Sequence, residues 1–283
     1  MIYVSTSCVK HNKIIDSVKE LANNGFKNIE LSGGTQYYDG FENDLLYLKE
    51  KHTLNYVCHN YFPPPKQHFV LNLASLNDEI YNNTLNHIKN TITLSKVLGA
   101  EKLGFHAGFF IDIKVNEIGK KITKEVLFDK DKAVKRFIRG VSELTEFAGQ
   151  FKLYIENNVF SSTNYKSYKG ENFFMLTNST DFFNLKKDLN FNLLLDVAHL
   201  KVSSKTLKLN FEEELLNLIK NSNYIHISDN DGFHDLNNTL TSNSELVKLL
   251  KKSDLSNKDF TLEIYDNMDK IKDTYKILNE VIS

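Results

Sequence analysis

Residues 192–199 read NLLLDVAH, residues 224–231 read YIHISDND and residues 260–265 read FTLEIY. Each stretch is a short apolar run that ends in acidic residues or histidine. Such runs are typical of strands buried on both faces of a parallel sheet. Together with five earlier runs they predict eight strands: Ile2–Ser5, Asn28–Leu31, Asn55–His59, Lys102–His106, Lys152–Glu156, Asn192–Asp196, Tyr224–Ser228 and Phe260–Tyr265.

Segments with the apolar spacing of amphipathic helices separate these strands. One begins at Asn77 or Asp78, whose side chains can cap a helix. The helical spacing is faintest after the second and sixth strands. Three of the segments end at a glycine suited to a C-terminal turn: Gly25, Gly99 and Gly149.

Eight alternations of strand and helix favour a closed (β/α)8 barrel, a TIM barrel, formed by one domain of residues 1–283. An open dinucleotide-binding sheet is disfavoured because the turn after the first strand, STSCVKHN, contains no glycine. In a TIM barrel the active site lies at the C-terminal ends of the strands. The long segment Ile111–Lys130 after the fourth strand is predicted to be an insertion that covers this rim.

The composition is that of a soluble globular protein, with 41% hydrophobic and 25% charged residues. Lys and Arg number 35 against 36 Asp and Glu, which gives a net charge of −1. This balance argues against nucleic acid and membrane surfaces as partners. Arginine, the usual bidentate partner of phosphate, occurs only at Arg136 and Arg139.

The cysteines and the N-terminus indicate a cytoplasmic protein. Cys8 and Cys58 are too few for a disulfide framework and are expected to be packed strand residues. Neither belongs to a motif that would activate a nucleophile, and Cys58 should point away from His59 on its strand. No signal peptide or apolar run of ~18 residues is apparent.

Six successive predicted strands end in side chains that can bind a metal ion. Histidines and carboxylates that converge on one barrel mouth would be poorly solvated without a cation. Their mixture of imidazole and carboxylate suits Mn²⁺ or Zn²⁺, and one or two ions are expected. The candidate residues are His59, His106, Glu156, Asp196, His199, His226 and Glu263.

The motifs CHNYF, FVLNLAS, GFHAG, IEN, LLLDVAH, HISDNDG and LEIY occur in this order and lie mostly at strand ends. Together they resemble the superfamily of xylose isomerase-like TIM barrels, which joins sugar isomerases and epimerases to the endonuclease IV family (AP endonuclease family 2). The resemblance covers essentially the whole chain. It implies a four-ligand metal site made of Glu156, Asp196, His226 and Glu263.

The endonuclease IV branch holds further ions, and the sequence departs from it at one position. There, His59 and His106 match ligands of a second ion that Glu156 would bridge. His199 matches either a ligand of a third ion or a substrate-binding histidine. The third site also needs an Asp-x-His motif, but this chain has Asp235-Leu236-Asn237, with His234 out of register.

Two reactions therefore compete. A sugar or polyol isomerase or epimerase would use Glu156 and Glu263 as acid and base, with His199 orienting a hydroxyl. A phosphodiesterase acting on abasic DNA would use two bridged ions, but the charge balance and Asn237 oppose it. The sequence also leaves two other functions as alternatives. One is a dehydratase, a lyase, of the inositol-degradation type, and the other is a barrel without catalytic activity. Four asparagines near the rim could bind a polyhydroxy substrate or be structural: Asn60, Asn157, Asn158 and Asn230.

Overall fold

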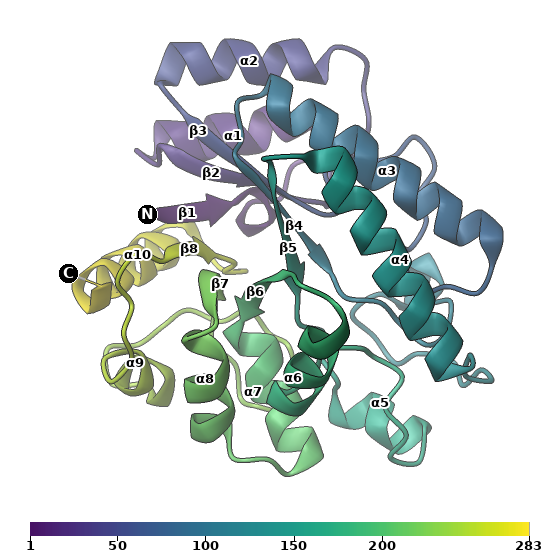
Figure 1. Ribbon diagram of the computed structural model, residues 1–283. Helices are drawn as coiled ribbons and strands as arrows, with labels where there is room; N and C mark the ends of the chain where they lie inside the picture. The colour runs from purple at the N-terminus through teal and green to yellow at the C-terminus, as the bar shows by residue number, and fades with distance from the viewer. Residues whose placement is uncertain (283) are drawn as a thin grey trace.

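The computed structural model describes residues 1–282, which form a closed barrel of eight parallel strands (Figure 1). Each strand pairs with the next, and β8 pairs with β1. The predicted TIM barrel is confirmed, with small shifts at the last two strands. The strands are β1 (Ile2–Ser5), β2 (Asn28–Leu31), β3 (Asn55–His59), β4 (Lys102–His106), β5 (Lys152–Glu156), β6 (Asn192–Asp196), β7 (Ser222–Ile227) and β8 (Asp259–Leu262).

Helices surround the barrel, and the two labelled termini lie on the same side of it in Figure 1. No helix within residues 1–282 is both long and apolar enough to cross a membrane. The α-helices are α1 (Ile14–Asn23), α2 (Phe41–His52), α3 (Asp78–Val97), α4 (Lys130–Ala148), α5 (Ser162–Ser167), α6 (Ser179–Asp188), α7 (Val197–Leu207), α8 (Phe211–Ile219), α9 (Glu245–Leu250) and α10 (Met268–Ile282). Two 3-10 helices are η1 (Thr6–Cys8) and η2 (Val115–Glu117).

The capping signals mark helix ends as expected. The side chain of Asn77 accepts a hydrogen bond from the backbone N–H of Glu79 at 2.9 Å and begins α3. The faint signal after the sixth strand has a physical reason. Helix α7 buries apolar residues together with Ser203 and Ser204, so it lacks the polar face on which helical spacing depends.

Alternation along the strands builds the barrel interior in layers. One buried layer consists of Tyr3, Val57, Tyr154, Leu194 and Tyr224. The residue two positions later on each strand points to the same side, one level nearer the C-terminal end. These next residues are Ser5, His59, Glu156, Asp196 and His226, all buried. The pleat of the strands thus places the predicted ligands on top of an aromatic layer.

Of the two cysteines that were predicted to be strand residues, Cys58 lies on a strand and Cys8 does not. Cys58 contacts Ser95 of α3, away from His59, as predicted. Cys8 is not a strand residue but lies in η1, where its thiol donates to the carbonyl of Leu262 at 3.2 Å. Both cysteines are free and buried, and burial raises the pKa of each thiol to about 12.

Gly104 on β4 makes room for one of the candidate ligands. A Cβ atom at this position would lie 2.8 Å from Cδ2 of His59 and 2.7 Å from Cδ2 of Leu194. Any side chain here would push into the His59 ring. The glycine of the GFHAG motif therefore allows the close approach of β3 and β4 side chains inside the barrel.

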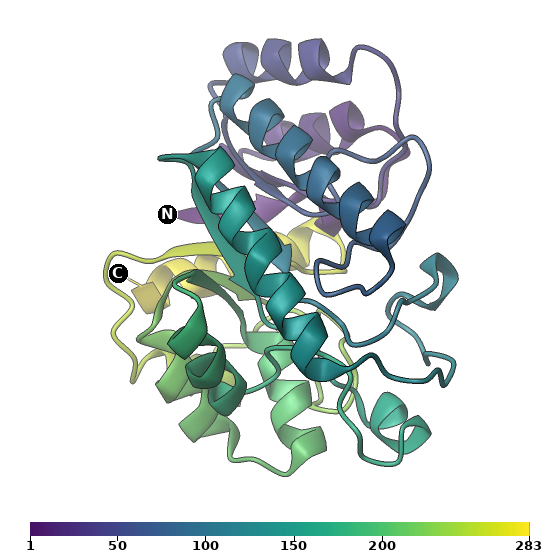
Figure 2. The ribbon, with the colours of Figure 1, turned by 45° about the vertical axis from the view of Figure 1, so that its right-hand side comes forward.

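The predicted insertion after β4 is a long segment with little regular structure, and it packs against α5 (Figure 2). The Tyr168 hydroxyl donates to the carbonyl of Thr123 at 2.8 Å, and the Asn164 side chain accepts from Ile122 N–H at 2.9 Å. These contacts join the β4–α4 and β5–α6 connections into one layer at the C-terminal side of the barrel.

A lysine closes the opposite end of the barrel interior. Lys102 is 5% exposed, and its Nζ lies 3.9 Å from the ring centroid of Tyr224 and 5.3 Å from that of Tyr3. Nζ also lies 2.6 Å from Oδ2 of Asp259. The aromatic faces and the carboxylate together stabilise an ammonium group that burial alone would disfavour.

Replacing Lys102 with Met is expected to lower the free energy of unfolding by about 2–3 kcal/mol, because the cation–π contacts and a partly buried ion pair are lost. Urea denaturation at pH 7 measures the change. Lys152, the register partner of Lys102 on β5, is exposed and serves as the control. Lys152→Met should stay within about 0.5 kcal/mol of the wild type. Equal losses in the two variants would contradict this role of Lys102.

Candidate metal centre and active site

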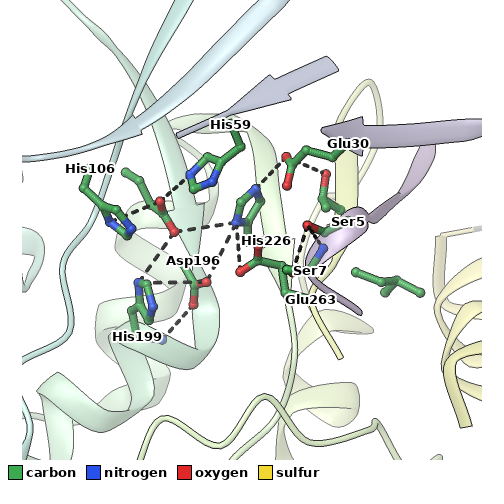
Figure 3. Close-up of polar contacts among 12 residues, drawn as sticks. Ser5, Ser7, Glu30, His59, His106, Asp196, His199, His226 and Glu263 are labelled. Carbon is green, nitrogen blue, oxygen red and sulfur yellow. Dashed lines mark hydrogen bonds and ion pairs between the residues drawn. The ribbon is translucent and has the colours of Figure 1, made fainter. Parts of the chain in front are cut away.

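The C-terminal ends of six strands deliver the predicted ligands to one place. Figure 3 shows the labelled histidines and acids pointing toward one another at the barrel mouth. Asp196 also begins α7, since its Oδ1 accepts from the backbone N–H of His199 at 2.7 Å. Glu263 lies one residue past β8, and its N–H donates to the carbonyl of Ile227 at 3.2 Å. Ladder and cap contacts therefore hold the backbone at both positions.

Glu156 is at the centre of the cluster and is completely buried. Its Oε2 lies 2.7 Å from Nε2 of His59 and 3.2 Å from Nδ1 of His106. Its Oε1 lies 3.6 Å from Nδ1 of both His199 and His226. Each carboxylate oxygen thus faces nitrogens of a different pair of histidines.

His226 faces the other predicted carboxylate ligands. Its Nδ1 lies 3.6 Å from Oε2 of Glu263 and 4.0 Å from Oδ2 of Asp196, in addition to Glu156. This nitrogen is buried and has no hydrogen-bond partner among the described residues, and neither does Oε1 of Glu156. Buried polar atoms without a partner are costly, so one nitrogen and several carboxylate oxygens aimed at a common point fit a divalent cation.

Four groups of described residues have ligand atoms that all lie within 4.8 Å of one another, which is close enough to share an ion. Glu156 belongs to two of them and His226 to two. The groups are Asp196 with His226 and Glu263, His59 with Glu156 and His226, His106 with Glu156 and His199, and Glu30 with His59 and Glu263. The sequence-predicted ligands are therefore all brought together.

Burial and the neighbouring charges shift the pKa values of the cluster in both directions, and the carboxylates raise those of His59 and His226. Burial disfavours a charge on Glu156, but His106 and His59 outweigh it and hold the pKa of this carboxyl well below its usual range. Burial raises the pKa of Asp196 to about 7. It lowers the pKa of His106 to about 4, which keeps this imidazole neutral and suited to bind a metal.

The ring nitrogens of His199 have different partners. Nδ1 lies 2.9 Å from the carbonyl oxygen of Asn157, so it donates there, and Nε2 lies 3.3 Å from Oδ2 of Asp235. Burial would lower the pKa of His199, but the carboxylates of Asp196 and Asp235 raise it well above its usual value. His199 can therefore present a charged N–H group beside the mouth.

The loop after β7 shows whether His234 replaces the histidine that is missing from the third-metal motif. Asp235 reaches His199, whereas His234 pairs with Asp231 at 2.9 Å and has a side chain that is 62% exposed. His234 does not take the place of the missing histidine. Asn237 is buried in a left-handed conformation (φ 49°), and its carbonyl accepts from the N–H of Tyr265.

The amides of the rim asparagines contact backbone groups, which favours the structural alternative. Asn157 donates to the carbonyl of Asp196 at 3.0 Å and accepts from its N–H at 2.7 Å. Asn158 donates to three backbone carbonyls, and Asn60 accepts from the N–H of His106. Asn230 bridges the backbone of α7 and its own loop. Their amides hold the strand ends in position.

One member of the cluster was not predicted. Glu30 on β2 is completely buried, and its Oε2 lies 2.9 Å from Nε2 of His226. The signal in the sequence was a single acidic residue within NIEL, an otherwise buried strand. A charge inside such a strand indicates a polar partner in the barrel interior.

A closed (β/α)8 barrel with a histidine–carboxylate cluster at the C-terminal ends of its strands defines the class of this protein. The chain belongs to the xylose isomerase-like TIM barrel family, whose model matches residues 18–281. A search of curated proteins finds no match.

Solved structures with the same fold include both branches expected from the motifs. A D-tagatose 3-epimerase-like protein has a TM-score of 0.72 at 18% identity, over 99% of this chain and 96% of that one. D-psicose 3-epimerase from Clostridium cellulolyticum has a TM-score of 0.65 at 13% identity, over 99% and 95%. Endonuclease IV from Thermus thermophilus has a TM-score of 0.59 at 14% identity, over 99% of both chains. At these identities the likeness shows the fold alone.

Proposed function

We propose that this protein is a metal-dependent isomerase or epimerase of a sugar or a sugar-like polyol. The observation that carries the proposal is the pair Glu156 and Glu263, whose carboxylates each lie 3.6 Å from Nδ1 of His226. Two carboxylates at one site can remove a proton from a substrate carbon and return one. The epimerase relatives support a carbohydrate substrate.

The four residues that would hold the cation are Glu156, Asp196, His226 and Glu263. Mn²⁺ and Zn²⁺ both suit this donor set. When bound, the ion would supply Lewis-acid polarisation of substrate oxygens and so lower the barrier to removal of the neighbouring C–H proton.

Side chains of the protein would transfer the proton and orient the substrate. The side chain of Glu263 is 11% exposed and that of Glu156 only 1%, so Glu263 is the carboxylate more open to a substrate from the mouth. Glu263 would take the proton, and Glu156, held by His59, would act as its counterpart. His199 would orient a substrate hydroxyl through Nε2, which also faces Oδ2 of Asp235 at 3.3 Å, because its Nδ1 is occupied by the Asn157 carbonyl.

Addition of the metal is expected to stabilise the purified protein. The cation would satisfy the unpartnered atoms of Glu156 and His226, and binding to the folded state alone stabilises by about 2.7 kcal/mol at 100 times the dissociation constant. Thermal unfolding after chelation and after addition of Mn²⁺ or Zn²⁺ measures this. A midpoint that does not respond to either ion would contradict the metal site.

The reaction is tested by incubating the metal-loaded protein with a panel of ketoses, aldoses and polyols that carry a carbonyl group in D₂O. A substrate should gain deuterium at the carbon that is epimerised or isomerised, as seen by NMR, and chelation should stop this exchange. Absence of exchange across a panel of free and phosphorylated sugars, with the metal bound, would overturn the proposal.

A second candidate is an endonuclease IV-like phosphodiesterase acting on abasic DNA. The observation that favours it is the contact of His59 and His106 with Oε2 of Glu156, which suits a second ion. Incubation with an abasic-site duplex and added Zn²⁺ or Mn²⁺ tests it. We expect no strand cleavage, and nicking together with two ions per chain would place this function first.

A further inference from the structure

Glu30 is a buried carboxylate inside the barrel, one layer below the mouth. It is the only charged residue of β2, and none of its surface is exposed. Its Oε2 accepts hydrogen bonds from the Tyr224 hydroxyl, from Oγ1 of Thr261 at 3.2 Å and from Nε2 of His226 at 2.9 Å. Side chains of β2, β7 and β8 therefore meet at a single oxygen atom, and Figure 3 shows the contact between Glu30 and His226.

These bonds determine which nitrogen of His226 is free. Since Nε2 donates to Glu30, Nδ1 is the nitrogen left to face Glu156, Asp196 and Glu263. A carboxylate that accepts from the far nitrogen of a metal-binding histidine sets the tautomer and the ring orientation, and raises the basicity of the nitrogen that binds.

Packing alone does not explain an acid at this position. Oε1 of Glu30 is buried and has no hydrogen-bond partner among the described residues, so part of the desolvation cost is not recovered. An apolar side chain would avoid that cost but would leave Nε2 of His226 without an acceptor. The hydrogen bond to His226 is the contact that requires a carboxylate.

We infer that Glu30 is a positioning residue, which holds His226 with Nδ1 directed at the cation while Tyr224 and Thr261 hold the carboxylate. The inference rests on the metal binding of the proposed function. In this role Glu30 would not itself be a ligand, although its carboxylate lies within 4.8 Å of ligand atoms of His59 and Glu263, with which it forms a group that could hold an ion.

The test compares the metal affinity of Glu30→Gln with that of the wild type by competition between Mn²⁺ or Zn²⁺ and a chromophoric chelator. The dissociation constant should rise about 10–100-fold, with the number of ions per chain unchanged at saturation. Tyr224→Phe, which removes only one hydroxyl, should give a smaller rise. Unchanged affinity in Glu30→Gln would overturn the inference, as would the loss of an ion at saturation, since Glu30 would then be a ligand.

Glu214→Gln is the matched control for burial of a carboxylate. Glu214 is 8% exposed and accepts hydrogen bonds from the N–H and hydroxyl of Ser179, away from the mouth. This variant should be less stable than the wild type but should bind the metal equally well. An equal loss of affinity in Glu214→Gln and Glu30→Gln would show that both act only through general stability.

A second measurement separates this inference from the proposed function. Long-range ¹⁵N–¹H correlation spectra of the metal-free protein report which ring nitrogens of His226 carry a proton, with the signals assigned by their loss in His226→Asn. We expect a proton on Nε2, and a bare Nε2 would overturn the positioning role even if the protein binds no metal. A wild-type protein that binds no metal but has the Nε2 proton would contradict the proposed function alone.

Discussion

Glu263→Gln is expected to slow the exchange of the substrate C–H proton with solvent by about 10²–10⁴-fold. The amide of Gln cannot accept the proton, but its oxygen can still occupy the position of a metal ligand. Metal content should therefore fall far less than activity. Deuterium incorporation and elemental analysis on the same preparation measure the two effects separately.

The control for this variant is Asp266→Asn, three residues along the chain. Asp266 is exposed, and its side chain accepts a hydrogen bond from the neighbouring N–H of Asn267. Its exchange rate should match that of the wild type. If Glu263→Gln with bound metal exchanges at the wild-type rate, Glu263 is not the base and the two-carboxylate mechanism is wrong.

Glu156→Gln is expected to weaken metal binding by more than about 100-fold. Mutation of a residue that only contacts a metal ligand already lowers metal affinity by about 10–100-fold, and Glu156 is itself a proposed ligand. Glu156 is the residue that contacts four histidines, so its negative charge serves both halves of the cluster. The purified variant should contain little metal and should show no deuterium exchange. Elemental analysis per chain, before and after addition of excess Mn²⁺ or Zn²⁺, measures the loss.

Glu101→Gln controls for the removal of a glutamate charge, since Glu101 is exposed and precedes β4 at the opposite end of the barrel. It should retain the wild-type metal content. A Glu156→Gln protein with full metal content would mean that the ion binds elsewhere, and the four-ligand assignment would have to be abandoned. The two glutamate variants together separate the residue that mainly holds the ion from the residue that mainly moves the proton.

The barrel and the location of its site could be predicted from the sequence because both depend on local patterns. Short apolar runs indicate buried parallel strands, and the connection rules of such strands lead to one closed architecture. Residues at the C-terminal ends of the strands must then be neighbours, however far apart they are along the chain. For this reason His59, Glu156, Asp196 and Glu263 could be proposed as candidate ligands from the sequence.

The roles of individual polar groups depended on the tertiary structure. Asn157 is of a residue type that could bind a sugar hydroxyl, yet its side-chain amide pairs with the backbone of Asp196. Asp235 and His234 are adjacent in sequence, and only the loop conformation determines that Asp235 reaches His199 while His234 faces solvent.

Glu30 shows most clearly that the role of a polar group can depend on the tertiary structure. It lies 196 positions before His226 in the chain, and no local pattern connects the two residues. Strand periodicity determines which side of the barrel a side chain faces, and so the sequence alone determined the fold and the set of candidate ligands. Hydrogen bonds between distant strands depend on register and on distances of a few tenths of an ångström, so only the tertiary structure decided which nitrogen of His226 is left free for an ion.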